Sequence, residues 1–157
     1  MAKPASKEFE LYVEAIVSST ATNTALDMTD YVDIADNQAF EIHELDIVHD
    51  VTQTFPSSDT DVVFQLSDAN LADFISHADR ASLYICRKTF DSATLSMFKE
   101  ESFSSITPLI VSKTLYLRHD VLSGVAGNYT LRMKGRIVTP SAKDYMALVL
   151  TQTGNVA

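Results

Sequence analysis

The stretch EFELYVEAIVS (residues 8–18) decides the fold class, because its apolar and polar residues alternate. Glutamates dominate its even positions, and its odd positions are all apolar: Phe9, Leu11, Val13, Ala15 and Val17. Alternation over this length is typical of a β-strand with one buried face. We therefore expect a sheet that covers a core with one of its faces.

Similar runs recur outward from this stretch, separated by clusters of turn residues such as SSTATNTA (18–25) and PSSDT (56–60). The run AFEIHELDIVHDV (39–51) changes parity at His43-Glu44, which predicts a β-bulge or a strand that changes sheets. Strands repeated through a whole chain indicate a sandwich or a barrel. The remaining runs are 61–66, 83–88, 109–119, 129–139 and 144–151.

One stretch has helical spacing. Ser67 is a suitable cap, and apolar residues follow at intervals of three and four from Leu71 to Ala78, which predicts a helix over about residues 68–78. Residues 91–105 show no firm period and are interpreted as a long loop with a short helix near 95–98. The run 144–151 is predicted as a buried strand, with a helix capped by Ser141 as the alternative.

The charges are sorted by half. Residues 1–79 hold sixteen acids and two bases, whereas residues 80–157 hold ten bases and five acids, within a net charge of −9. Such asymmetry concerns partners rather than fold. The two halves can neutralise each other within one chain or between neighbouring copies.

A basic stripe on the run 129–139 consists of Arg132, Lys134 and Arg136, with Arg118 as an extension across the turn 123–128. Like charges in a row repel unless acids oppose them. Those acids can come from an adjacent strand, from a neighbouring subunit or from nucleic-acid phosphates. We treat these residues as candidates for a subunit interface.

An aspartate strip lies in DMTDYVDIAD (27–36), where four carboxylates are spaced by threes: Asp27, Asp30, Asp33 and Asp36. Carboxylates suit calcium, but the spacing is not that of an EF-hand loop. The strip is interpreted as a weak calcium candidate, as a docking strip for a basic neighbour, or as a solvated acidic connection.

Motifs for other chemistry are weak. The single cysteine, Cys86, lies within a strand, and the four histidines lack the spacing of a zinc site. No nucleophile elbow or phosphate-binding loop occurs. Asn128 begins a glycosylation triplet without a signal peptide. We therefore expect no enzyme and no metal beyond the weak calcium candidate. The histidines are His43, His49, His77 and His119.

The length fits one domain, which we place at 8–152, with a flexible N-terminal arm at 1–7 and a C-terminal tail at 153–157. The first residues do not form a signal peptide, and no apolar run approaches the ~20 residues of a membrane-spanning helix. An acidic pI of 4.7 argues against direct nucleic-acid binding.

The order of the elements resembles the single jelly-roll capsid proteins of tailless icosahedral viruses. The resemblance covers the strand at 8–18, the Ser/Thr loop, the segment 31–50, the helix and the closing elements at 109–151. It implies an all-β fold: a two-sheet β-sandwich of jelly-roll type with one short inserted helix at about residues 68–78. The basic N-terminal arm of many such proteins is reduced here to Lys3 and Lys7.

The leading hypothesis is accordingly a structural protein that self-assembles into a viral capsid. Its partners would be copies of itself in a large homo-oligomer, with or without other capsid proteins, and it would be found in virions assembled in the host cytoplasm. The alternative is a carbohydrate- or ligand-binding β-sandwich module, which the absence of tryptophan weakens. Acid–base chemistry by Glu10 and Glu14 is disfavoured, because a straight strand holds them ~13 Å apart.

Overall fold

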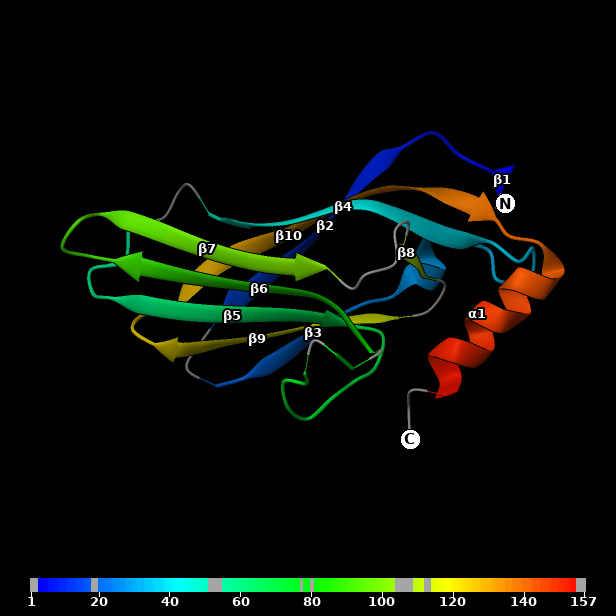
Figure 1. The fold of residues 1–157 in the computed structure, drawn as a ribbon. Helices are drawn as coiled ribbons and strands as arrows, with labels where there is room; N and C mark the ends of the chain where they lie inside the picture. Colours follow the sequence, from blue (N-terminus) through cyan, green and yellow to red (C-terminus); the bar gives the residue numbers. More distant parts are fainter. Residues whose placement is uncertain are drawn as a thin grey trace.

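Two antiparallel sheets pack face to face in the computed structural model, which describes residues 3–17, 20–50, 55–76, 78–79, 81–103, 109–111 and 114–154 (Figure 1). Sheet A contains β1 (Lys3–Pro4), β2 (Phe9–Val17), β4 (Ala39–His49), β8 (Leu109–Val111) and β10 (Gly127–Thr139). Sheet B contains β3 (Thr22–Leu26), β5 (Thr60–Ser67), β6 (Ser82–Asp91), β7 (Ser96–Phe103) and β9 (Leu115–Ser123). Two helices complete the described elements: the 3₁₀-helix η1 (Met28–Asp30) and α1 (Ala142–Gly154).

The strands are wound as a jelly roll. When β1 and β7 are set aside, the first strand pairs with the last, the second with the second last, and so on inward: β2 with β10, β3 with β9, β4 with β8, and β5 with β6. This nesting of antiparallel pairs between two sheets defines the jelly-roll arrangement. The prediction of an all-β, two-sheet sandwich is confirmed.

The core lies between the sheets. On β2, Leu11, Val13, Ala15 and Val17 are buried as the alternation predicts. The ring of Phe64 on β5 meets the ring of Tyr129 on β10 edge to face, with centroids 5.0 Å apart, so the two sheets contact each other directly. Aromatic pairs in this geometry stabilise a core beyond the area that they bury.

The change of parity at His43 is a β-bulge. Lys134 of β10 is opposite Glu44 of β4, and the next residue, Gly135, is opposite Ile42, so His43 is the extra residue. A Cβ at Gly135 would lie 2.1 Å from the carbonyl oxygen of Glu41. Glycine is therefore required where the bulged strand approaches β10.

The predicted helix at about residues 68–78 is wrong for the part that the structure describes. Residues 68–76 and 78–79 form bends and turns, and His77 lies outside the described residues. The side chain of Gln65 explains the difference, because it donates to the carbonyl of Ile75 and accepts from its N–H, each at 2.9 Å. Side-chain partners that satisfy the backbone in this way compete with helix formation.

The helix of the structure is instead α1, where we predicted a strand at 144–151. The alternative with a Ser141 cap is correct: the N–H of Asp144 donates to Ser141 Oγ at 3.1 Å, and the Ser141 hydroxyl donates to Asp144 Oδ2 at 2.7 Å. A serine cap that accepts from the N–H three residues later satisfies a free donor at the start of a helix and so favours its initiation. The helix continues to Gly154.

Three further predictions are corrected. The loop at 18–25 includes most of β3, and the single strand at 109–119 is two strands in opposite sheets, β8 and β9. The loop at 91–105, described to residue 103, is a hairpin that closes through residues 92–95 and continues as β7. At the N-terminus, β1 pairs with β10, and Ala5 N–H donates to the carbonyl of Ile137 at 2.9 Å.

Candidate functional site

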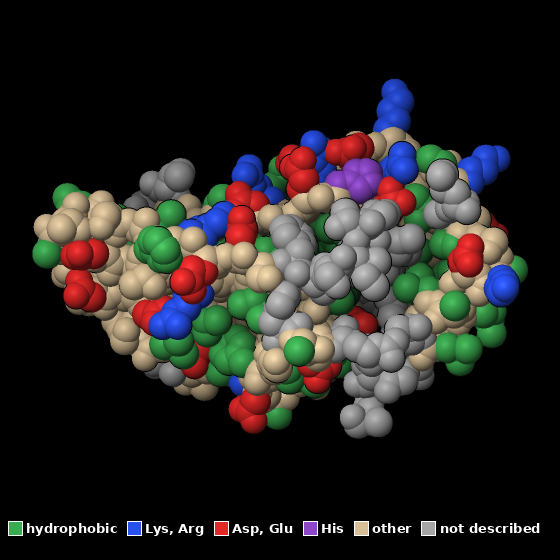
Figure 2. Space-filling view, viewed as in Figure 1, with side chains coloured by type: hydrophobic (Ala, Val, Ile, Leu, Met, Phe, Trp, Pro, Cys, Tyr) green, Lys and Arg blue, Asp and Glu red, His purple; other side chains and the backbone are tan. Residues whose placement is uncertain are grey.

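The basic stripe lies on the outer face of sheet A, on the central strand β10. β10 is flanked by β2 and β4, and both neighbours present acids: Lys134 is opposite Glu10 on β2 and Glu44 on β4. Figure 2 shows acidic and basic side chains mixed along the upper rim of the molecule, where Figure 1 places this sheet. A row of bases between two acidic rows is the arrangement that removes repulsion along a strand.

Each base of the stripe has an acidic partner within the same chain. Arg132 Nη2 lies 3.1 Å from Asp46 Oδ2, and Arg136 Nη2 lies 3.0 Å from Glu41 Oε1. Lys134 Nζ lies 3.0 Å from Glu8, with Glu44 at 3.8 Å. Adjacent strands therefore supply the opposing acids, one of the three sources that the sequence allowed. A role for the stripe between subunits stays a prediction.

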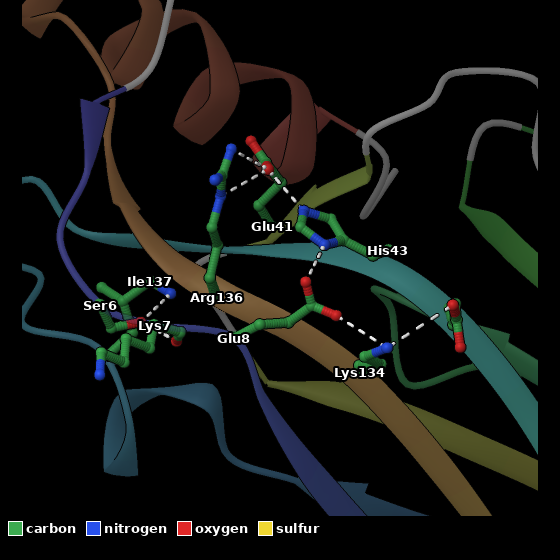
Figure 3. Close-up of polar contacts among 9 residues, drawn as sticks. Ser6, Lys7, Glu8, Glu41, His43, Lys134, Arg136 and Ile137 are labelled. Carbon is green, nitrogen blue, oxygen red and sulfur yellow. Dashed lines mark hydrogen bonds and ion pairs between the residues drawn. The ribbon is translucent and has the colours of Figure 1, made fainter.

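His43 joins two of these pairs into one network (Figure 3). Its Nε2 lies 2.7 Å from Glu41 Oε1, and its Nδ1 lies 3.3 Å from Glu8 Oε2. Only the doubly protonated imidazolium can donate to both carboxylates at once. Glu41 and His43 are two residues apart and therefore share a face of β4, and the bulge places Glu44, opposite Lys134, on that same outer face.

Ion pairing shifts the pKa of several members of the network. The hydrogen bond from Lys134 lowers the pKa of Glu8 below its ordinary value, and the same bond raises the pKa of Lys134. Burial opposes ionisation of Asp46, but hydrogen bonds from Lys99 and Arg132 outweigh it and lower its pKa. Ion pairing therefore favours the charged forms of Glu8, Lys134 and Asp46. Exposed pairs of this kind contribute little stability individually.

Lys99 extends the network from sheet A to sheet B. It lies on β7, and its Nζ is 3.0 Å from Asp46 on β4 and 3.3 Å from Glu101 on its own strand. Glu101 also accepts a hydrogen bond from the hydroxyl of Tyr84 at 2.7 Å. These contacts hold the edge of one sheet against the other. The sequence could not reveal them, because residues 91–105 were interpreted as a loop.

Lys88 is a buried lysine that the sequence analysis missed. Only 4% of Lys88 is exposed. The alternation of LYICRK could have indicated this burial, because it places Lys88 on the same face of β6 as Tyr84 and Cys86. Burial lowers the pKa of Lys88 and raises that of Cys86. The buried thiol agrees with the interpretation of Cys86 as unreactive.

Arg118 does not extend the stripe, contrary to the prediction. It lies on β9 in sheet B, where Nη1 donates to Asn23 Oδ1 at 3.1 Å and to the carbonyl of Leu71 at 3.3 Å. Its guanidinium lies over the ring of Phe74, 5.3 Å from the centroid. Arg118 is separated from the stripe because the turn 123–128 carries the chain from sheet B to sheet A. Its contacts with Leu71 and Phe74 anchor the segment after β5 instead.

The aspartate strip forms turns. Asp27 caps η1, and the hydrogen bonds that it accepts from the Thr29 hydroxyl and N–H lower its pKa. Asp33 accepts from the N–H of Ala35 at 2.9 Å. No ion pair among the described residues joins the strip to the basic stripe. Within the same residues, no group of three or more His, Cys, Asp or Glu side chains could hold a metal ion.

Of the other described histidines, His119 is buried and His49 is half-buried. His119 is buried on β9, 3.1 Å from the hydroxyl of Thr24, and burial lowers its pKa. His49 lies between the rings of Phe90 and Tyr129. Both rings therefore contribute to the packing of the strands around them.

No protein-family model, curated protein or solved structure matches this chain. Among the described helices, none is long and apolar enough to cross a membrane.

Proposed function

We propose that this protein is a structural subunit, without catalytic activity, that assembles with copies of itself into a viral capsid. One observation carries the proposal: a jelly roll whose sheet edges expose apolar side chains. Tyr12 and Ile16 are exposed on the edge strand β2, and Met97 and Phe98 on the edge strand β7. Repeated subunits need surfaces of this kind, because assembly depends on burying apolar area at the contacts.

The tip of the β6–β7 hairpin supports the proposal. Leu95 has a φ of 52°, a left-handed conformation that non-glycine residues adopt at a cost, and 70% of its surface is exposed. A leucine in this position gains no burial within its own chain. Burial against a neighbouring copy would offset the cost.

The helix α1 supports the proposal in the same way. Figure 1 shows it at one end of the sandwich, away from the central strands. Tyr145 is buried, whereas Met146 and Leu150 are exposed. A helix that is apolar on several faces is normally covered on more than one of them. In the proposed capsid, an adjacent subunit covers the exposed face.

Size-exclusion chromatography combined with negative-stain microscopy tests the proposal. We expect the purified chain to elute as large particles or to form them as the protein concentration, salt and calcium are varied. Spherical particles of uniform size would support a capsid. A stable monomer under all of these conditions would refute it.

A ligand-binding module is the second candidate, and one observation favours it. The loop after η1 encloses a shallow depression lined by residues 29–35 and Gln38, where Tyr31 is partly exposed beside Asp30 and Asp33. An aromatic ring next to polar side chains is a common arrangement for sugars and other small ligands. A glycan array in which the wild type binds and Tyr31→Ala does not would support this function. An array without binding would exclude carbohydrate ligands.

A further inference from the structure

The strand β7 forms one edge of sheet B. One side of it pairs with β6 in unbroken register from Ser96 opposite Asp91 to Phe103 opposite Tyr84. Along its other side, no strand of the described chain is paired. All residues from Ser96 to Ser102 are exposed, including Met97 (47%) and Phe98 (65%). A long, regular edge with exposed apolar residues is a template for pairing with another strand.

The other sheet edges are less suited to accept a second copy. The exposed face of β2 carries the acids Glu10 and Glu14, so pairing β2 with itself would bring like charges together. β3 has five residues and no charge, and β8 has three residues. Among the edge strands of the described residues, β7 alone combines the length of a full strand with charges of both signs.

The charges of β7 complement each other in one register of self-pairing. Lys99 and Glu101 are two positions apart and therefore share a face. In an antiparallel pair centred on Glu100, Lys99 lies opposite Glu101 of the second copy, and the two-fold axis repeats the contact. A register centred on Lys99 would instead place two lysines opposite each other.

The opposite face is compatible with the same register. Phe98 lies opposite Ser102 of the second copy, whose small side chain leaves room for the ring. The two Glu100 side chains face each other, but each also has Arg87 as its neighbour on β6. Arg87 is also paired with Asp61, so it offsets only part of the repulsion between the two Glu100 side chains, and the Lys99–Glu101 pairs carry the choice of register.

We propose that two copies of this chain join through antiparallel pairing of their β7 edges, centred on Glu100, so that two five-stranded B sheets become one continuous sheet. The inference deepens the proposed self-assembly and rests on it. Backbone hydrogen bonds supply the affinity, and the Lys99–Glu101 pairs select the register. Because a single strand edge is smaller than a standard interface, we expect the dimer contact to be one of several in the assembly.

A disulfide trap tests the register. In Glu100→Cys the two introduced thiols lie directly opposite each other, with Cβ atoms about 4.5–5.5 Å apart, close enough for a disulfide after a small adjustment. Ser96→Cys is the matched control, because it lies on the same face of β7 but about 27 Å from its copy in this register. The native Cys86 is buried and does not compete.

We expect mild oxidation to shift Glu100→Cys, on a non-reducing gel, from the 17.3 kDa chain to a covalent dimer, whereas Ser96→Cys stays monomeric. If the wild type forms particles but Glu100→Cys does not cross-link, or both variants cross-link equally, the β7 inference is wrong and self-assembly stands. If the wild type is monomeric and Glu100→Cys does not cross-link, both proposals fail. A cross-linked dimer without particles would support the β7 contact and count against a capsid.

Discussion

Replacing Gly135 by alanine tests the bulge that organises sheet A. The added Cβ would lie 2.1 Å from the carbonyl oxygen of Glu41 and 2.9 Å from two ring carbons of Phe40. Both obstacles are fixed, because one is backbone in the adjacent strand and the other is a fully buried ring. Overpacking of this kind costs about 1–3 kcal/mol, and we expect about 3 kcal/mol because neither strand can withdraw.

The loss is measurable by urea denaturation and by thermal unfolding. For a chain of this length, about 3 kcal/mol corresponds to a melting temperature about 6–12 °C lower. Thr130→Ala is the control on the same strand, because Thr130 faces outward; we expect it to cost less than about 1 kcal/mol. If Gly135→Ala were as stable as Thr130→Ala, the close approach at the bulge would be wrong, and so would the register between β4 and β10.

Further substitutions probe the core and the network. Phe64→Ala should lower the free energy of unfolding by about 3–5 kcal/mol, because it empties the contact between the sheets; a urea titration showing under about 1 kcal/mol would refute that packing. Arg136→Ala should cost about 1–3 kcal/mol, because it removes a partner of the buried Glu41 carboxylate. Arg132→Ala, at an exposed pair, should cost less than about 1 kcal/mol, and equal losses would contradict this ranking. The pKa of Asp46 is lower in the folded protein than in the unfolded chain, so the unfolded chain binds the proton more readily. The stability that Asp46 contributes is therefore present above the ordinary pKa of an aspartate. It is lost as the pH falls through the pKa that Asp46 has in the folded protein. Asp46→Asn should therefore flatten the decline of the urea midpoint between about pH 5 and about pH 3, and an unchanged slope would argue against this linkage.

The strands with a strong alternating pattern were predictable from the sequence. In β2 every second residue is buried, and the bulge at His43 follows from a change of parity that the sequence already shows. Both signals are local, since they depend only on which residues one strand turns toward the core. The sandwich fold could be predicted for the same reason.

Elements that depend on distant partners were not predictable. The segment after β5 has helical spacing, but Gln65 and Arg118 hold its backbone from two other strands. β7 has little apolar alternation, because its inward positions include Lys99 and Glu101, whose partners lie on β4 and β6. A sequence pattern does not contain these contacts until the strand pairing is known.

The candidate site could be predicted in part. The residue spacing places the three bases of the stripe on one face of β10, as observed. Their partners were not predictable, because Glu8, Glu41 and Asp46 come close to them only when β2 and β4 pair with β10 on either side. The same pairing explains how the acidic and basic halves of the chain neutralise each other in part within one subunit.

Sedimentation velocity at increasing protein concentration tests the central claim, self-assembly of the jelly roll, most directly. We predict species far heavier than the 17.3 kDa chain, with a share that grows with concentration. A single 17.3 kDa species at every concentration, at low and at high salt, would contradict the proposed function.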